Sequence, residues 1–125
     1  AIALWGGLAT SEQAAQVADR LDASSLAYPL ATVDEDDPTF DPKRYWRGPV
    51  WTVINWLLAH GLAEYGYLHH ANKVVSATLD LVGTHGFREH YDPRDGTPGG
   101  AQGFSWTAAL TLDLLHQPPA AKVAA

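Results

Sequence analysis

The stretch GPVWTVINWLLAHGL, residues 48–62, is apolar at nearly every position. Its Gly-Pro pair predicts the start of a helix, because proline is tolerated in the first helical turn. Apolar side chains cover most of the circumference, and only Thr52, Asn55 and His60 interrupt them before Tyr65-Gly66 ends the helix. A helix that is apolar nearly all round must be enclosed. We therefore expect other elements to surround it.

Two further helices are one-sided. Residues 11–22 begin with a capping-box pattern, in which Thr10 caps and Gln13 lies three residues on. Residues 69–84 form the other helix, which Gly86 closes. Each has one apolar face and one polar face, as is typical of a helix on the outside of a protein.

A fourth helix is again almost wholly apolar. It spans residues 106–116, and Ser105 can cap it. The order is outer helix, long loop (23–48), inner helix, turn, outer helix, long loop (87–103), inner helix. This alternation predicts an all-α toroid of helical hairpins with about four helices in this chain. Residues 117–125 are expected to form a frayed tail.

The two long loops have a geometric consequence. Both run into the N-terminus of an enclosed helix, so both emerge on the same rim, and residues 45–48 can meet residues 88–104. Two of the four helices are apolar nearly all round, and the other two are too few to cover them. We therefore expect residues 1–125 to be part of a larger ring, or one chain of a complex.

The composition excludes several classes of protein. The 125 residues include no cysteine, which excludes a disulfide scaffold, a thiol nucleophile and Cys-ligated metal sites. No window approaches the roughly 20 apolar residues of a membrane span. The formal net charge of −6 has the wrong sign for a binder of nucleic acid or anionic membranes. Localisation stays open, with the cytoplasm favoured.

Aromatic motifs stand in both loops. Residues 45–51 read YWRGPVW, residues 87–91 read FREHY, and residues 103–110 read GFSWTAAL. With these motifs the chain resembles the C-terminal part of glycoside hydrolase family 63 and the related bacterial mannosylglycerate and glucosylglycerate hydrolases. The resemblance runs from Leu4 to Leu115, and separate motifs in the expected order make it fairly specific.

The resemblance implies the C-terminal portion of an (α/α)6 barrel that hydrolyses an α-glycosidic bond with inversion. It implies that Glu89 is the general base, that Tyr45 and Trp46 contact the sugar, and that the general acid is an Asp upstream of residue 1. Mannosylglycerate, glucosylglycerate and short α-glucosides all remain possible substrates. The implied partners are a small carbohydrate and the remainder of the barrel, with no cofactor. The chain alone is expected to be inactive.

The chemistry of Glu89 fits the implied role. A carboxylate on a loop at the rim of a cavity can activate water, which inverting hydrolysis requires. The alternative is an ordinary exposed carboxylate paired with Arg88.

Two neighbouring side chains fit a sugar pocket. Trp46 offers an apolar face to a pyranose ring, and Arg47 offers a fork of donors to hydroxyls or to a carboxylate such as that of glycerate. The alternative is that Trp46 belongs to the core and that Arg47 pairs with Asp41 or with the acidic run 34–37.

Four more residues complete the set of candidates. Trp51 and Trp106 fit packing as well as substrate contact, because each lies at the start of an inner helix. Gln102 can bind a sugar hydroxyl, whereas Trp56 is expected in the core.

Metal sites are not expected. Residues 92–96 lack the twelve-residue calcium pattern, because Arg94 stands at a ligand position, and a plain turn is predicted. Among the six histidines, His69 and His70 are adjacent, and no pair has the i, i+4 spacing of a helical zinc site.

A second class of function fits the same aromatic residues. A non-catalytic carbohydrate-binding or assembly module would keep the aromatic rim and carry out no chemistry. The glycosidase interpretation makes the sharper prediction: Glu89 and Trp46 must lie at the same end of the helices.

Overall fold

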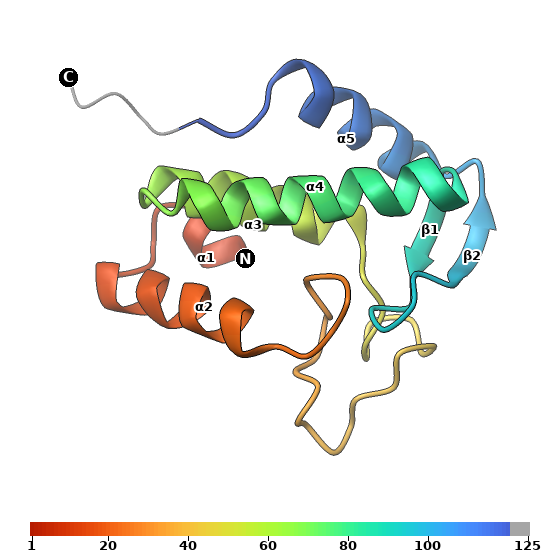
Figure 1. The fold of residues 1–125 in the computed structure, drawn as a ribbon, viewed down its shortest axis with the longest axis horizontal. Coiled ribbons are helices and arrows are strands. Elements are labelled where there is room, and N and C mark those ends of the chain that lie inside the picture. Colours follow the sequence, from red (N-terminus) through yellow and green to blue (C-terminus); the bar gives the residue numbers. More distant parts are fainter. Residues whose placement is uncertain (121–125) are drawn as a thin grey trace.

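The computed structural model describes residues 1–120, which form five helices and one antiparallel hairpin (Figure 1). The elements are α1 (Ile2–Trp5), α2 (Ser11–Ala23), α3 (Thr52–Glu64), α4 (Leu68–His85), β1 (Arg88–Tyr91), β2 (Pro98–Gln102) and α5 (Ser105–His116). The four predicted helices are confirmed. The four-residue α1 and the hairpin add to the predicted elements. No helix within residues 1–120 is long and apolar enough to cross a membrane.

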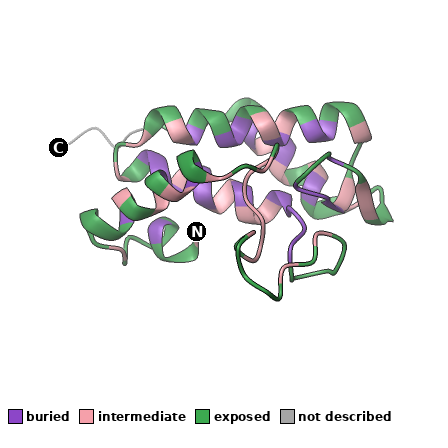
Figure 2. Ribbon diagram, turned by 60° about the horizontal axis from the view of Figure 1, so that its bottom comes forward, coloured by how far each residue is buried: buried purple, intermediate pink, exposed green. Residues whose placement is uncertain are grey.

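The inner helix α3 is enclosed, as its composition predicts. Helices α1, α4 and α5 pack around it, and no residue from Thr52 to Ala63 is exposed (Figure 2). Its contact with α1 is close, because a Cβ on Gly61 would lie 2.7 Å from the Cβ of Leu4. Only glycine at this position allows the two helices to approach so closely.

The other inner helix, α5, is enclosed on one side only. Trp106, Leu112 and Leu115 are 55%, 56% and 58% exposed in the described part of the chain. On the covered side, Asp113 accepts a hydrogen bond of 2.6 Å from the indole nitrogen of Trp56, which joins α5 to α3. Trp56 packs against the core, as predicted.

The start of α3 is later than predicted. The Gly48-Pro49 pair does not begin the helix; α3 begins at Thr52, and Trp51 is its N-cap. The reason is Val50, whose amide and carbonyl both bond to the backbone of Tyr91, at 2.8 and 3.0 Å. These bonds hold Val50 in an extended conformation, so the helix cannot include it.

The predicted cap of α5 was also wrong. Ser105 is the first helical residue, and the N-cap is Phe104, whose amide bonds to the carbonyl of Phe87 at 3.0 Å. That bond closes the base of the hairpin and fixes where the helix begins. After α5, residues 117–120 are not helical; residues 121–125 of the predicted tail lie outside the described residues.

The outer helix α2 begins as predicted. The Thr10 hydroxyl accepts a bond from the amide of Gln13, and the Gln13 side chain accepts one from the amide of Thr10. This reciprocal capping satisfies two amides that the first helical turn leaves free.

The two long loops meet on one rim, as predicted. Helices α3 and α5 both begin beside the hairpin (Figure 1). Val50 bridges Ala31 on one side and Tyr91 of β1 on the other. Val50, at the end of the first loop, therefore pairs with the start of its own loop on one side and with the hairpin on the other.

The first loop is held by a buried side chain of α3. Asn55 accepts a bond from the amide of Leu30 at 2.7 Å and donates to the carbonyl of Pro29 at 2.6 Å and to Thr78 of α4 at 2.9 Å. Asn55 is fully buried, so these bonds satisfy a polar group that would otherwise destabilise the core.

Candidate active site

An aromatic cluster occupies the shared rim. The ring of Trp46 stacks on that of Trp51, with centroids 3.9 Å apart and planes 9° apart. Tyr45 meets both rings edge-on, at 5.8 and 5.0 Å. His90 of β1 lies 5.4 Å from Trp51 and 6.2 Å from Tyr45. Residues 45–51 and the hairpin therefore converge, which confirms the predicted placement of these residues at one end of the helices.

The two tryptophans of the stack have different environments. Trp51 is 2% exposed, and its indole nitrogen donates to the carbonyl of Tyr45 at 3.1 Å. This burial favours the interpretation that Trp51 is a packing residue. Its ring forms the buried side of the stack with Trp46. Trp46 is 42% exposed, so it does not belong to the core, and it presents an open ring face.

Tyr45 adopts an uncommon backbone conformation. Its φ is +37°, in the left-handed region that side-chain-bearing residues rarely occupy. The strain is compatible with a residue whose position is imposed by its neighbours, here the rings of Trp46 and Trp51.

Glu89 lies in β1, next to this cluster. Its Oε2 accepts a hydrogen bond of 2.9 Å from the amide of Ala101 in β2. Hydrogen bonding to the Glu89 carboxylate raises the pKa of the Tyr45 hydroxyl. None of the ion pairs found among residues 1–120 joins Glu89 to Arg88. The carboxylate is therefore half-buried, oriented by a backbone amide and directed toward the aromatic cluster.

His90 is the buried member of the site. Burial lowers its pKa, although the nearby charge of Glu89 opposes the shift. The imidazole is therefore neutral at pH 7. A neutral ring between Tyr45 and Trp51 packs without adding a positive charge beside Glu89.

The other candidate residues flank the cluster. Arg47 and Gln102 are exposed, the latter at the end of β2 opposite Arg88. Trp106 is exposed and lies 5.6 Å from the ring of Phe104. Phe104 in turn lies 6.4 Å from Trp51, so a line of rings connects Trp106 to the cluster.

Arg47 acts on the acidic run 34–37 through its charge: the pKa of Asp37 is lowered chiefly by hydrogen bonds from Thr39 and in smaller part by Arg47. No ion pair within residues 1–120 joins Arg47 to Asp41 or to the acidic run 34–37. Asp34 and Asp36 pair with Arg20 of α2 instead. The guanidinium of Arg47 is therefore left at the exposed edge of the site.

The segment after β1 is a turn, as predicted. The buried carboxylate of Asp92 accepts two bonds from the Arg94 guanidinium, at 2.7 and 3.0 Å, and one from the Arg94 amide at 3.0 Å. Across residues 1–120, the structure shows no group of three or more His, Cys, Asp or Glu that could hold a metal ion.

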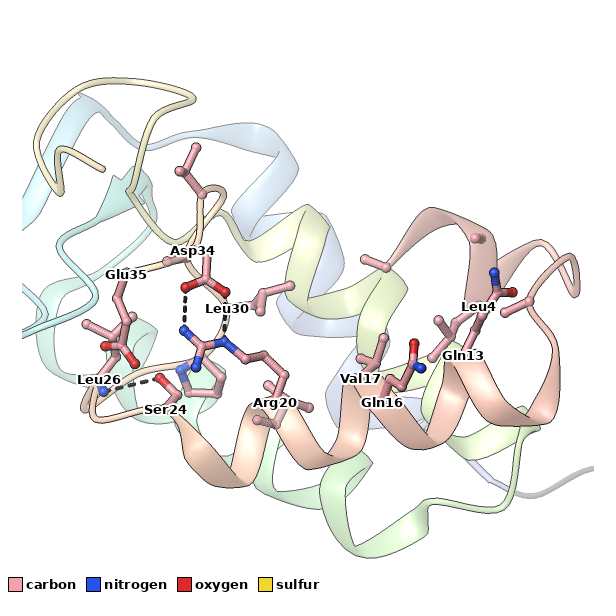
Figure 3. A pocket seen from close by; sticks show the side chains of 17 residues that line it. Leu4, Gln13, Gln16, Val17, Arg20, Ser24, Leu26, Leu30, Asp34 and Glu35 are labelled. Carbon is pink, nitrogen blue, oxygen red and sulfur yellow. Dashed lines mark hydrogen bonds and ion pairs between the residues drawn. The ribbon is translucent and has the colours of Figure 1, made fainter. Parts of the chain in front are cut away.

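Three cavities in the described chain lie apart from this site. One mostly apolar cavity of about 450 Å³ is lined by α1, α2 and the loop up to Glu35, where Arg20 reaches Asp34 (Figure 3). Within the described residues, none of these three cavities is lined by Trp46 or Glu89.

Sequence reasoning missed the residues that seat Glu89 and His90. A Cβ on Gly100 would lie 2.4 Å from Oε2 of Glu89, and one on Gly99 would lie 2.3 Å from Cε1 of His90. The signal was present: the pair Gly99-Gly100 and the turn at Asp95-Gly96 are the marks of a hairpin.

Comparison with known proteins shows which family the chain resembles. Residues 1–107 match the model of the mannosylglycerate hydrolase MGH1-like glycoside hydrolase domain. The mannosylglycerate hydrolase of Thermus thermophilus is 46% identical over 98 residues, which are 78% of this chain and 23% of that protein. Mannosylglycerate hydrolase MGH1 of Selaginella moellendorffii is 41% identical over 116 residues, 91% of this chain and 24% of that protein.

A solved structure shows the same arrangement of helices. The crystal structure of the GH63 mannosylglycerate hydrolase from Thermus thermophilus, in complex with Tris and D-glycerate, superposes with a TM-score of 0.84 at 40% identity. The match covers 87% of this chain and 27% of that one, so the chain spans about a quarter of the length of these relatives. The predicted part of an (α/α)6 barrel is confirmed. The chain belongs to the family of mannosylglycerate hydrolase MGH1-like glycoside hydrolases.

Proposed function

We propose that this chain carries the water-activating base and part of the sugar pocket of an inverting α-glycosidase whose first candidate substrate is mannosylglycerate. The observation that carries the proposal is the position of Glu89. Its carboxylate lies beside the stacked Trp46 and Trp51, bonded to a backbone amide and engaged by Tyr45. An oriented carboxylate next to an open aromatic face is what a base in a sugar site needs.

The proposed reaction needs two carboxyl groups. Glu89 takes a proton from water, whose oxygen attacks the anomeric carbon as the bond from that carbon to the leaving oxygen breaks. A carboxylic acid on the opposite side gives its proton to the leaving oxygen, and inversion requires the two groups to be about 6.5–9.5 Å apart. In this proposal the acid is an Asp from a part of the enzyme outside these 125 residues.

The sugar and the aglycone have separate contacts in the proposal. The open face of Trp46 receives the C–H face of the pyranose, and the buried Trp51 keeps that face in place. Arg47 at the exposed edge has the donor geometry to bind the carboxylate of glycerate. We assign Gln102 and Trp106 to a second wall of the pocket, which their exposed side chains support.

The remaining walls are assigned to the rest of the barrel. The exposed apolar residues of α5 and the apolar cavity beside α1 and α2 are surfaces that a complete ring would cover. The length of the relatives supports this assignment, since the chain corresponds to about a quarter of each. We therefore expect the 125-residue chain alone to show no turnover.

The test is Glu89→Gln in the complete enzyme that contains this chain. Loss of the base is expected to lower kcat by about 10³-fold or more while sugar affinity stays within a few-fold. Glu12→Gln, which changes an exposed carboxylate of α2, is the control and should leave kcat unchanged.

Three results would contradict the proposal. Near-normal turnover of Glu89→Gln would remove this residue from the base role. A product released with retained anomeric configuration, measured by NMR during hydrolysis, would exclude the inverting mechanism. Turnover by the 125-residue chain alone would show that no second carboxyl group from outside is needed.

A further inference from the structure

The strand opposite Glu89 contains a bulge. Arg88 pairs with Gln102 and His90 pairs with Gly99, so the single residue Glu89 faces two residues, Gly100 and Ala101. Gly100 has a φ of +66°, the left-handed conformation that glycine adopts at the first position of such a bulge. Bulges of this kind change the direction of a side chain or of a backbone amide.

This bulge provides both a seat and a donor for the Glu89 carboxylate. A Cβ on Gly100 would lie 2.4 Å from Oε2 and 2.6 Å from the Cβ of Glu89, so the side chain lies directly over bare backbone. The next amide, that of Ala101, donates to the same Oε2 at 2.9 Å. The extra residue in β2 therefore turns the amide of Ala101 toward the carboxylate. In a regular ladder that amide would have bonded to the backbone of the partner strand.

The adjacent position repeats the arrangement for His90. A Cβ on Gly99 would lie 2.3 Å from Cε1 and 2.6 Å from Nδ1 of that ring. His90 in turn packs against Trp51 and Tyr45. Gly99 and Gly100 thus seat two neighbouring side chains of β1 at once.

We propose that Gly100 and the backbone amide of Ala101 position the Glu89 carboxylate for catalysis, and that the bulge exists at this site for that purpose. The inference rests on the proposed function of Glu89 as the base. Gly100 and Ala101 touch no substrate; they act through Glu89 and are positioning residues. A displacement of about 1 Å can lower a rate by about 10²-fold, so a misplaced carboxylate loses a large part of its catalytic effect.

The chain offers a matched pair of glycines for the test. Gly100 and Gly103 have nearly the same φ, +66° and +67°, and lie in the same segment. A Cβ at Gly103 would have nothing within 4 Å, whereas one at Gly100 would collide with Glu89. Alanine therefore introduces the same backbone strain at both positions and displaces the carboxylate only at Gly100.

In the complete enzyme, Gly100→Ala is expected to lower kcat by about 10²-fold with KM within about three-fold. Gly103→Ala is expected to keep kcat within about three-fold of the unchanged enzyme. Equal losses of kcat in the two variants would overturn the inference, because backbone strain alone would then account for them.

A second readout does not depend on turnover. Glu89 raises the pKa of Tyr45, so the titration of Tyr45, followed by NMR in the complete enzyme with labelled tyrosine, reports where the carboxylate lies. In Gly100→Ala this pKa should fall toward the ordinary tyrosine value, as in Glu89→Gln, and in Gly103→Ala it should not change. An unchanged Tyr45 titration in Gly100→Ala would overturn the inference.

The two readouts also separate this inference from the proposed function. If Glu89→Gln stays active, the role of Glu89 as base fails, and the titration of Tyr45 still decides whether Gly100 seats it. If Gly100→Ala does not fold, the amide of Ala101 is replaced by an ester, which removes the donor alone. A kcat lowered about ten-fold by the ester supports the inference, and an unchanged kcat contradicts it.

Discussion

The two segments that form the rim are held in different ways. The loop of residues 24–51 has no helix or regular strand and is held by side chains, chiefly Asn55, and by bridges at its ends. The hairpin of β1 and β2 is held by its own backbone ladder. The loop carries Tyr45 and Trp46, to which the proposed function assigns sugar contact, and the hairpin carries Glu89, to which it assigns the role of base. Recognition is thus assigned to the segment with side-chain anchors, and chemistry to the one with a rigid backbone.

The largest expected effect comes from removing the anchor of the loop. Asn55→Ala leaves the amide of Leu30 and the carbonyl of Pro29 without their buried partner, which should lower the free energy of unfolding by about 3 kcal/mol. Urea unfolding measures this change. Asn72→Ala, at an exposed position of α4, is the control and should change stability by less than about 0.5 kcal/mol.

Hydrogen exchange then sharpens the comparison. In Asn55→Ala the amide of Leu30 should lose protection, while the amide of Asp92, which bonds to the carbonyl of Thr97 within the hairpin, should keep it. Equal loss of protection in both segments would show that the loop and the hairpin are a single unit.

A smaller effect is expected from the recognition residue. In the complete enzyme, Trp46→Ala should raise KM about ten-fold, a change of about 1.4 kcal/mol, because the open ring face is lost. The effect on kcat should be much smaller than that of Glu89→Gln. Trp5→Ala, an exposed tryptophan of α1 that packs on Trp56, should leave KM unchanged. A loss confined to kcat would place Trp46 with the chemistry instead.

The smallest effect is a dependence of stability on pH. Burial lowers the pKa of His90 and of His60, so the unfolded chain binds protons more readily than the folded one near pH 6. The stability from their neutral forms is fully present above the ordinary histidine pKa and is lost as pH falls through the lowered values. Unfolding by urea at pH 7, 6 and 5 should show decreasing stability, and His90→Gln should flatten the trend. If stability falls as steeply with pH in His90→Gln as in the unchanged protein, groups other than His90 cause the pH dependence.

Much of the fold follows from hydrophobic patterning. The nearly unbroken apolar surface of α3 predicts its enclosure, and Thr10 with Gln13 predicts the start of α2. The alternation of inner and outer helices also predicts that the two loops share a rim. These features depend on local periodicity, which the sequence displays directly.

The parts that were missed depend on contacts distant in sequence. The first turn of α3 is lost because Val50 pairs with Tyr91, a residue 41 positions later. The turn at Asp95-Gly96 signals a hairpin, but β2 contains a proline and two glycines, which have low strand propensity, so no strand was predicted there. Glu89 could be singled out from its motif. The bulge that positions its carboxylate could not, because it depends on the register of the two strands.

The bridge between Ala31 and Val50 has a consequence for engineering. It brings the two ends of residues 32–49 together, and the amide of Gly48 reinforces the closure by bonding to Thr32. A segment whose ends already meet can be exchanged or lengthened at little entropic penalty, about 0.6 kcal/mol for each doubling of its length. Residues 32–49 are therefore a segment whose length and sequence can be changed between fixed ends, which gives a direct way to test the sugar contacts proposed for Tyr45 and Trp46.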